Sequence, residues 1–318
     1  MKPIGGYFEI ADREQGVFIH SNGTLLNTGR NALEWILLSL GKVERVYIPS
    51  YTCDVVLEPL VRLEIPWSYY KIDKNLEVAE DISLEPREYI VVNNYFGVKD
   101  SYIQQIATKY GDRLIVDCAQ AFFAKPLPGV KTCYSARKFV GVSDGGVAYG
   151  CNNDLSALAE DDTSNHSQHL FIRKQHGAEA GFADYRKDEE MLDNQVPKRM
   201  SSFTKDILNN IDYPVIVEKR RNNYSFLADE LSQRNLLSLP PIDTFVAPMC
   251  YPFMVENGDE LRKKLIEKKV FVPRFWPNEN IPESSINSLI LSKSILPLPC
   301  DQRYGKEEMN RIIEIINM

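Results

Sequence analysis

The chain has 318 residues, of which 44% are hydrophobic and 25% are charged, a composition typical of soluble globular proteins. Its formal net charge of -7 disfavours nucleic acid or an anionic membrane as a partner, because both attract clustered lysine and arginine. No apolar run reaches the roughly 18 residues of a membrane-spanning helix, and the first residues lack the order of a signal peptide. We therefore expect a cytoplasmic protein with one large and one smaller domain.

Cysteine and histidine spacing favours neither a disulfide framework nor a metal site. The six cysteines are scattered and form no C-x-x-C pair, which predicts reduced thiols buried as small hydrophobic groups. His166 and His169 lie three residues apart, but no cysteine or carboxylate follows at a metal-ligand spacing. We expect no bound metal.

The first strong pattern, at residues 27–41, predicts a capped helix. Thr28 is a residue type that caps helix N-termini, and a glycine at the far end is a typical stop signal. The first turn then contains Gly29, Arg30 and Asn31. Free backbone N–H groups and the helix dipole make such a turn an anion site. Taken alone, an ordinary capped helix explains the pattern equally well.

Strands and helices then alternate, which predicts a mostly parallel sheet with right-handed crossovers. The expected strands are residues 45–48, 67–72, 89–92 and 113–116, and the expected helices end at residue 61 and cover 100–110. Ligands of such sheets bind at the carboxyl ends of strands. Three polar clusters fall at those ends, at residues 49–53, 93–97 and 117–122.

Two titratable residues near the last of these strands, Asp117 and Lys138, are candidates for a chemical role. Asp117 follows the apolar run of a strand, where a buried carboxylate requires a cation or strong hydrogen-bond donors. Gln120 lies three residues further on and points roughly the same way if a turn begins there. Lys138 lies on a loop between two short extended pieces, before the pair Gly145 and Gly146. The simpler alternative is a surface lysine beside a hairpin turn.

The second half of the chain divides into a charged stretch and a smaller α/β unit. Residues 154–200 predict helices and loops, with a solvated face as the first explanation of their charge and a substrate or subunit contact as the second. The division into domains is expected between residues 212 and 213. The remaining expected elements are helices at 201–211, 216–234, 259–269 and 306–316, a strand at 246–255 and an extended segment at 270–276.

A loop lysine, a buried aspartate and a helix N-terminus are together the three parts that pyridoxal 5'-phosphate requires. The lysine forms a Schiff base with the aldehyde of the cofactor. The carboxylate keeps the pyridine nitrogen protonated, so that the ring can accept electrons, and the helix N-terminus binds the phosphate. Lys138, Asp117 and Gly29 occur in an order consistent with this use.

The chain resembles the DegT/DnrJ/EryC1/StrS family of pyridoxal-phosphate-dependent sugar aminotransferases. That resemblance implies fold type I, the α/β fold of aspartate aminotransferase, with a mainly parallel central sheet in a large domain and a smaller C-terminal α/β domain. The matching motifs span nearly the whole chain in the family's order: TGRNAL (28–33), IPSYTC (48–53), NNYFG (93–97), VDCAQAF (116–122), YSARKFVGVSDGG (134–146), MSSFT (200–204), RRNNY (220–224) and the stretch from ILPLP to the C-terminal helix.

The resemblance implies a role for each of these residues. Lys138 would form the Schiff base and act as the general base, Asp117 would pair with the pyridinium nitrogen, and Gln120 would contact the phenolic oxygen of the ring. The first turn at 29–31 would hold the phosphate. Family members commonly transfer an amino group from glutamate to a keto group of a nucleotide-linked sugar, in surface polysaccharide or related biosynthesis. The resemblance also implies a homodimer with its active site at the interface.

The chain departs from the family pattern at two positions next to the cofactor. The family carries a serine that binds phosphate five residues before the lysine, where this chain has Cys133; Ser135 is the replacement. An aromatic residue that stacks on the cofactor is replaced by Cys53, and Tyr51 or Tyr95 is the expected substitute.

A third departure affects the residues that reach across the dimer. The family's N-x-R motif contacts the phosphate of the partner subunit, and Pro197 stands here at the position of its asparagine. Arg199 is retained, and Asn194 is the expected replacement for the asparagine.

Two alternatives to sugar transamination follow from these features. One is a different pyridoxal-phosphate reaction, such as dehydration, although the sugar dehydratases of this group carry histidine where this chain has Lys138. The other is a non-catalytic relative that binds the cofactor or a sugar nucleotide for regulation, which the altered cofactor positions favour.

Overall fold

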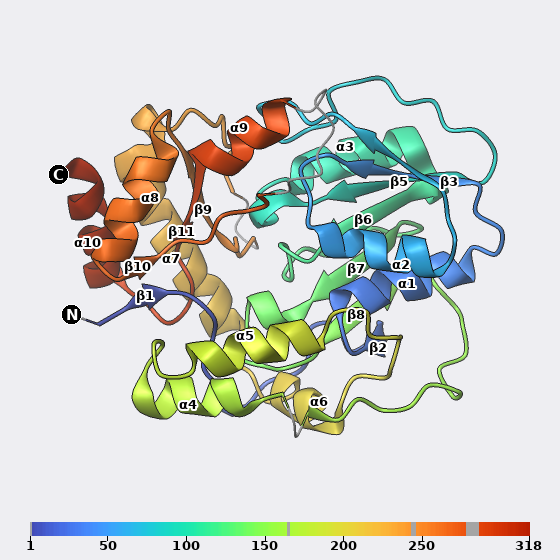
Figure 1. The fold of residues 1–318 in the computed structure, drawn as a ribbon, viewed down its shortest axis with the longest axis horizontal. Helices are drawn as coiled ribbons and strands as arrows, with labels where there is room; N and C mark the ends of the chain where they lie inside the picture. The colour runs from blue at the N-terminus through green and yellow to red at the C-terminus, as the bar shows by residue number, and fades with distance from the viewer. Residues whose placement is uncertain (1, 164–165, 243–245, 278–285) are drawn as a thin grey trace.

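The computed structural model describes residues 2–163, 166–242, 246–277 and 286–318. A broad sheet and its helices form one side of the molecule, and a smaller unit that contains both chain ends forms the other (Figure 1). This arrangement confirms the predicted α/β architecture of a large and a small part. The division between residues 212 and 213 stays a prediction. Within the described ranges, no helix has the length and apolar character to cross a bilayer.

Seven strands form the central sheet in the order β2-β8-β7-β6-β5-β3-β4. The pairs from β4 across to β7 are parallel, and β8 runs antiparallel to both of its neighbours. The predicted mostly parallel sheet is therefore confirmed, with the four predicted strands within two residues of their expected bounds. The strands are β2 (Thr24–Leu26), β3 (Arg45–Pro49), β4 (Trp67–Tyr70), β5 (Glu88–Asn93), β6 (Leu114–Cys118), β7 (Lys131–Ser135) and β8 (Gly146–Tyr149).

Helices cover both faces of the sheet because its strands are apolar on both sides. In β5, Val91 packs into a core cluster with residues of α1 and α2, whereas Ile90 and Val92 pack into a second cluster with α3. Successive strand residues point to opposite faces, so a continuous apolar run fills both layers. The helices are α1 (Gly29–Ser39), α2 (Leu57–Arg62) and α3 (Asp100–Tyr110).

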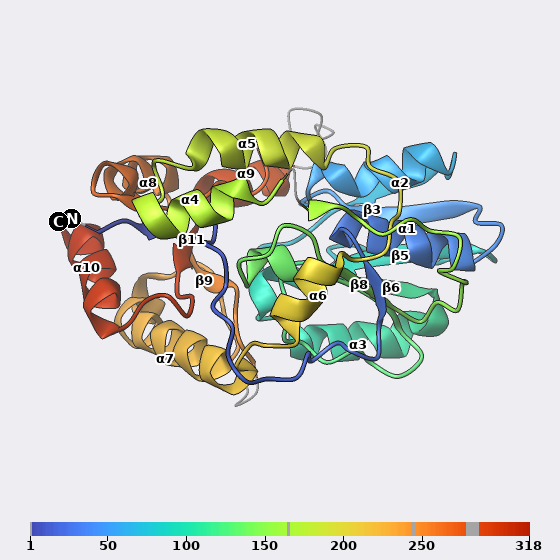
Figure 2. The same cartoon turned by 90° about the horizontal axis from the view of Figure 1, so that it is seen from below.

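The charged stretch after β8 folds as predicted, into helices joined by loops. Its helices are α4 (Gln168–His176) and α5 (Phe182–Met191), and residues 164–165 lie outside the described ranges. Helix α6 (Ser202–Leu208) follows the stretch and lies within the helix predicted at 201–211. His169 Nδ1 of α4 forms a buried hydrogen bond with Asp188 Oδ2 of α5 at 2.5 Å. Figure 2 shows α5 running from α4 toward α2, which brings its C-terminal end to the edge of the central sheet.

The smaller unit is built on a short antiparallel sheet and four helices. Strand β9 (Cys250–Met254) pairs with β11 (Ile295–Pro299), and β1 (Ile4–Gly5) pairs in parallel with β10 (Val270–Phe271). The helices are α7 (Tyr213–Leu231), α8 (Gly258–Glu267), α9 (Ile286–Ser294) and α10 (Lys306–Asn317). Short 3-10 turns of both units join these elements, namely η1 (Asp54–Val56), η2 (Tyr95–Gly97), η3 (Gly111–Arg113), η4 (Ala136–Lys138) and η6 (Ser232–Arg234).

The smaller unit differs from the sequence expectation in three strands and in helix α9, which was not predicted. The strand predicted at 246–255 begins only at Cys250. Strand β11 was not predicted, because Pro297 and Pro299 are residues that strands seldom contain away from an edge. Strand β1 was not predicted either, because two residues carry no periodic signal.

Candidate active site

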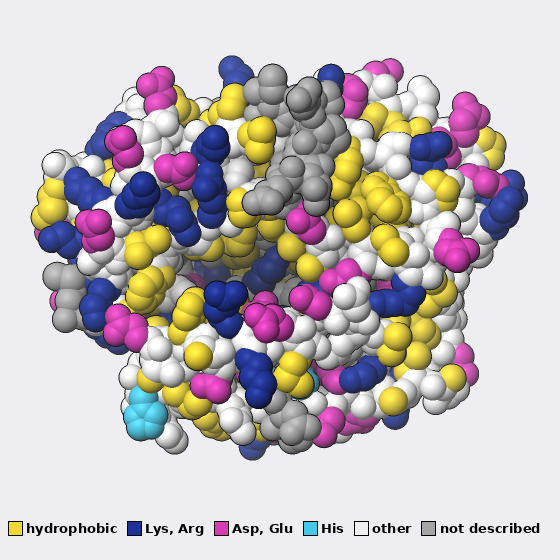
Figure 3. Space-filling model, in the orientation of Figure 1, with side chains coloured by type: hydrophobic (Ala, Val, Ile, Leu, Met, Phe, Trp, Pro, Cys, Tyr) yellow, Lys and Arg dark blue, Asp and Glu magenta, His cyan; other side chains and the backbone are white. Residues whose placement is uncertain are grey.

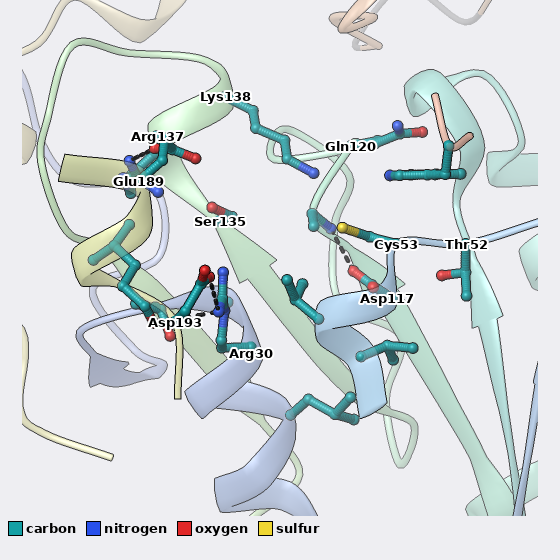
Figure 4. A pocket seen from close by; sticks show the side chains of 18 of the residues that line it. Arg30, Thr52, Cys53, Asp117, Gln120, Ser135, Arg137, Lys138, Glu189 and Asp193 are labelled. Carbon is teal, nitrogen blue, oxygen red and sulfur yellow. Dashed lines mark hydrogen bonds and ion pairs between the residues drawn. The ribbon is translucent and has the colours of Figure 1, made fainter. Parts of the chain in front are cut away.

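A cavity of about 640 Å³ lies at the carboxyl ends of the parallel strands. The space-filling view shows the molecule hollowed near the centre of one face (Figure 3), and the side chains around the cavity come from widely separated segments (Figure 4). The residues that line it include Thr28, Gly29, Arg30, Thr52, Cys53, Asn93, Asn94, Asp117, Ala119, Gln120, Ser135, Arg137, Lys138, Phe182, Tyr185, Arg186, Glu189, Glu190, Leu192, Asp193 and Trp276. All three predicted polar clusters thus contribute to one pocket.

Lys138 lies on η4, the turn that follows β7, and its side chain points into the cavity (Figure 4). Hydrogen bonds on both sides hold this turn. The N–H of Ala136 donates to Gly145 O at 2.8 Å. The carbonyl of Phe139 accepts from Arg220 Nη2 at 3.1 Å and from Gln302 Nε2 at 2.7 Å. The lysine backbone is therefore fixed by the central sheet and by the smaller unit together.

Asp117 lies in β6 next to the strand's end and faces the same cavity. Its Oδ1 accepts the N–H of Ala119 at 2.8 Å. Burial raises the pKa of the Asp117 carboxyl, and the Ala119 N–H, the charge of Lys138 and the Cys133 thiol each oppose this rise. Among the described residues Asp117 forms no ion pair. It is a partly buried carboxyl that a cationic ligand would stabilise in its ionised form.

The N-terminus of α1 meets the end of β7 at the floor of the cavity. The Thr28 hydroxyl accepts the N–H of Asn31 at 3.1 Å, and the first turn leaves further N–H groups without intrahelical partners. A Cβ added at Gly29 would lie 3.2 Å from Ser135 Cβ and 3.4 Å from Tyr134 O. Gly29 therefore allows helix and strand to approach closely, which brings Ser135 beside the helix N-terminus.

The side chains of Arg30 and Asn31 are already engaged with the protein. The Arg30 guanidinium pairs with Glu58 and, at 3.1 Å, with Asp193, and it donates to Leu192 O at 3.2 Å. Asn31 is buried, its Nδ2 donates to Gln195 O at 2.8 Å, and it does not line the cavity. Any contact of these two residues with a ligand phosphate is therefore expected from the backbone of the turn.

Two carboxamide side chains of the cavity each have one atom without a partner. Asn93 Nδ2 donates to Thr52 Oγ1 at 3.0 Å, and Gln120 Oε1 accepts the N–H of Phe96 at 3.0 Å. These bonds leave Asn93 Oδ1 and Gln120 Nε2 buried with no partner in the described part of the chain. Buried polar groups are normally satisfied, so the two atoms indicate a polar ligand. The position of Asn93 at a strand end was the available signal for it.

In addition to Asn31, three of the predicted cofactor-binding residues lie outside the cavity lining. Tyr51 and Tyr95 are buried against each other, with ring centroids 5.5 Å apart, and each hydroxyl donates to a backbone carbonyl. Asn194 donates its N–H to Glu58 on the exposed side. The structure therefore does not support stacking by either tyrosine. Cys53 does line the cavity, as does Trp276, whose indole contacts the Tyr51 ring edge to face.

Sequence interpretation also missed the contribution of α5. Its residue Glu189 enters the cavity and forms an ion pair with Arg137, the residue before Lys138. Burial disfavours the ionised form of Glu189, but Arg137 outweighs it and holds the pKa of this carboxyl below its usual range. An isolated charged helix carries no signal for such a contact.

The described residues also bear on the predictions for metal sites and cysteines. Within the described ranges, no group of three or more metal-ligating side chains is present. All six cysteines are free thiols, of which Cys118, Cys133, Cys250 and Cys300 are buried. Cys133 lies beneath the cavity without lining it.

Comparisons with known proteins identify the fold. No family model matches the sequence, and no curated protein matches it. Among solved structures, the putative sugar aminotransferase Spr1654 from Streptococcus pneumoniae in its PLP form aligns with a TM-score of 0.65 and 14% identity over 98% of this chain and 91% of that chain. DesV from S. venezuelae aligns with a TM-score of 0.64 and 15% identity over 92% of this chain and 82% of that chain.

A third similar structure is the sugar aminotransferase CalS13 from Micromonospora echinospora, with a TM-score of 0.59 and 15% identity over 92% of this chain and 85% of that chain. A DegT DnrJ EryC1 StrS aminotransferase from Brucella abortus is also similar, at 17% identity. At this level of identity the likeness establishes the fold, and the predicted fold type I is confirmed.

Proposed function

We propose that this chain is a pyridoxal-phosphate-dependent aminotransferase that moves an amino group from glutamate to the keto group of a nucleotide-linked sugar, in surface polysaccharide or related biosynthesis. One observation carries the proposal. Lys138, Asp117 and the first turn of α1 border one cavity, in a chain that has the fold of solved sugar aminotransferases. Each of the three is suited to a different part of the cofactor.

The residues around the cavity fit this cofactor. The unpartnered Gln120 Nε2 is a donor suited to a ring oxygen, and Asp117 is a partly buried carboxyl that would gain a cationic partner. The close approach of α1 and β7 at Gly29 leaves N–H groups and the Ser135 hydroxyl at one point, which suits a phosphate. Ser135 lines the cavity and Cys133 does not, which supports Ser135 as the residue for that role.

Each residue then has a defined task. Pyridoxal phosphate, when bound, supplies an electron-accepting ring. Asp117 would hold the proton on the ring nitrogen, because an ionised carboxylate stabilises an adjacent cation in a buried site. The Nζ of Lys138 would bind the cofactor aldehyde. Once the donor amine has taken its place, the same nitrogen would accept the proton from the amino-bearing carbon of the donor and deliver it to the former aldehyde carbon. The turn η4 keeps this nitrogen in place.

The assembly and location of the protein are part of the same proposal. A homodimer with its site at the interface is supported by exposed apolar residues of α5 near the cavity, Phe182 and Met191. Asn194 would then act toward the cavity of the partner. We also propose a cytoplasmic location and a domain division between residues 212 and 213. Light scattering would give the solution mass, and a monomer at micromolar concentration would contradict the dimer.

Cofactor capture tests the central claim. Purified protein is incubated with pyridoxal phosphate, reduced with borohydride, digested and analysed by mass spectrometry. The expected result is a cofactor adduct on the peptide that contains Lys138, absent in Lys138→Ala and retained in Lys174→Ala. The control lysine is exposed and pairs with Asp12 outside the cavity. A protein that acquires neither visible absorbance nor an adduct would contradict the enzyme and favour a regulatory relative.

A second measurement tests the reaction class. Glutamate should convert the loaded protein to the pyridoxamine form, with loss of the visible band, and a panel of nucleotide-linked keto sugars should restore it. Capture of the cofactor without any response to amino donors would refute transamination and favour a different pyridoxal-phosphate reaction. A response to glutamate but to no sugar would refute the proposed acceptor.

A further inference from the structure

A second cation lies beside Lys138 in the cavity. Arg137 precedes it on η4, and the Arg137 side chain is only 18% exposed. Its Nη2 donates to Glu189 of α5, whereas its Nε is buried and has no partner in the described part of the chain. Figure 4 shows Arg137 and Glu189 together on one side of the cavity, with the Lys138 side chain extending between them and Gln120. The guanidinium therefore keeps an unused donor.

The Glu189 carboxylate that pairs with Arg137 is partly exposed, so a ligand can compete with it for the guanidinium. Glu189 lies on the last turn of α5, and its side chain is 40% exposed, so that water is available to it if the ion pair opens. Burial opposes ionisation of Glu189, but the charge of Arg137 lowers its pKa by more, and the charge of Lys138 adds a smaller decrease, as expected for a carboxylate near both cations. A carboxylate held by an arginine next to the reactive lysine occupies the position that an acidic ligand would take.

We propose that Arg137 binds a carboxylate of the amino donor, and that Glu189 occupies this position until the donor displaces it. The inference rests on the proposed function. In an amino acid the α-carboxylate is two bonds from the amino nitrogen, so the cation that binds it must lie close to the lysine. A guanidinium suits this task, because its planar donors bind a carboxylate through two parallel hydrogen bonds.

The other arginines of the cavity are less suited. Arg30 already pairs with two carboxylates, those of Glu58 and Asp193. Arg186 lies at the exposed rim, where its side chain is 67% exposed and approaches Glu190 at 4.0 Å. Arg137 combines burial, an unused donor and direct adjacency in the chain to Lys138. The donor-binding role therefore falls to Arg137.

Binding of a dicarboxylate without an amino group gives the first test. Glutarate is titrated calorimetrically into cofactor-loaded wild type, Arg137→Gln and Glu189→Gln, with Arg13→Gln as the control, since Arg13 pairs with Asp206 at an exposed site. Loss of Arg137 should weaken binding about 10- to 100-fold, the range of a charge-assisted hydrogen bond. Loss of Glu189 should strengthen binding several-fold, because it removes the competing carboxylate.

Opposite signs for the two variants distinguish ligand binding from a structural role. If the ion pair only held α5 in place, both substitutions would weaken glutarate binding. That outcome, or unchanged binding by Arg137→Gln, would overturn the inference. Arg137→Lys should recover part of the affinity, since it restores the charge without the planar pair of donors.

Conversion of the loaded protein by different amines gives the second test and identifies the carboxylate. The rate constants for glutamate, alanine and 4-aminobutyrate are each divided by that for butylamine, which has no carboxylate. In Arg137→Gln the ratio should fall 10- to 100-fold for alanine if the α-carboxylate binds, or for 4-aminobutyrate if the distal one does. If wild type responds to glutamate but both ratios are the same in Arg137→Gln as in wild type, this inference alone is refuted. Wild type without a cofactor band refutes the proposed function as well.

Discussion

Replacing Arg220 by methionine should destabilise the whole chain and loosen the turn that carries Lys138. Arg220 lies on α7 and is fully buried, with 0% of its surface exposed. Its guanidinium donates to the carbonyls of Pro248 at 3.0 Å, Met249 at 3.3 Å and Phe139 at 3.1 Å. Methionine retains a flexible apolar stem but donates to none of them.

The magnitude follows from the acceptors that lose their donor. Phe139 O keeps its bond from Gln302. Met249 O loses the bond that Arg220 gives it, and Pro248 O keeps only a long, weak S–H bond from Cys300 at 4.0 Å. A buried acceptor without a partner costs about 1–3 kcal/mol. Two of them cost about 4 kcal/mol, a large fraction of the 5–15 kcal/mol that typically stabilises a domain. Methionine carries no charge, so the free-energy cost of burying the guanidinium disappears, and this offsets part of the loss.

Urea unfolding followed by circular dichroism would measure the change in unfolding free energy. The control is Lys219→Met, which removes a positive charge from an exposed neighbouring position of the same helix and should change stability by less than about 0.5 kcal/mol. A loss below about 1 kcal/mol for Arg220→Met would refute the reasoning, because it would mean that the carbonyls of Pro248 and Met249 find other donors. Borohydride labelling of Lys138 should also slow in this variant.

Two further predictions concern stability. His20 is buried, bonds to Phe122 O at 2.6 Å and Tyr149 Oη at 3.2 Å, and has its pKa lowered to about 4 by burial. The neutral His20 side chain contributes fully to the free energy of unfolding above pH 6.5, and this contribution is lost as the pH falls toward 4. When the pH is lowered from 7.5 to 5, urea unfolding should therefore show that wild type loses about 2 kcal/mol more than His20→Phe. An equal loss in both proteins would refute this. Gly146→Ala would place Cβ 2.0 Å from Thr28 O, so we expect a loss of at least about 3 kcal/mol by the same assay, and a loss below 1 kcal/mol would contradict the clash.

The parts of the site that the sequence could predict are those set by local order along the chain. Gly29, Asp117 and Lys138 each lie within a residue or two of the end of a helix or strand. Parallel strands bring their carboxyl ends to one edge of the sheet, so knowledge of the strands alone is enough to bring these residues together. The central sheet was predictable for the same reason, since a run such as that of β5 fills both faces.

The parts that could not be predicted depend on contacts between distant segments. Trp276 and Glu189 reach the cavity from the smaller unit and from α5, and neither position is marked by periodicity or spacing. Tyr51 has a suitable position in the chain for stacking, but its hydroxyl donates to Phe275 O and turns the ring into the core. Side-chain direction in an irregular turn follows from such tertiary bonds.

The way in which α5 is attached makes one wall of the cavity depend on charge pairs rather than on apolar packing. Asp188 is the buried residue of this helix, and its C-terminal end is joined to the body of the molecule by the pairs of Glu189 with Arg137 and Asp193 with Arg30. The arginines of both pairs are largely buried, so salt screens these pairs less than it screens a fully exposed pair such as that of Arg13 with Asp206. This wall should therefore stay in place at ionic strengths that dissociate pairs on the protein surface.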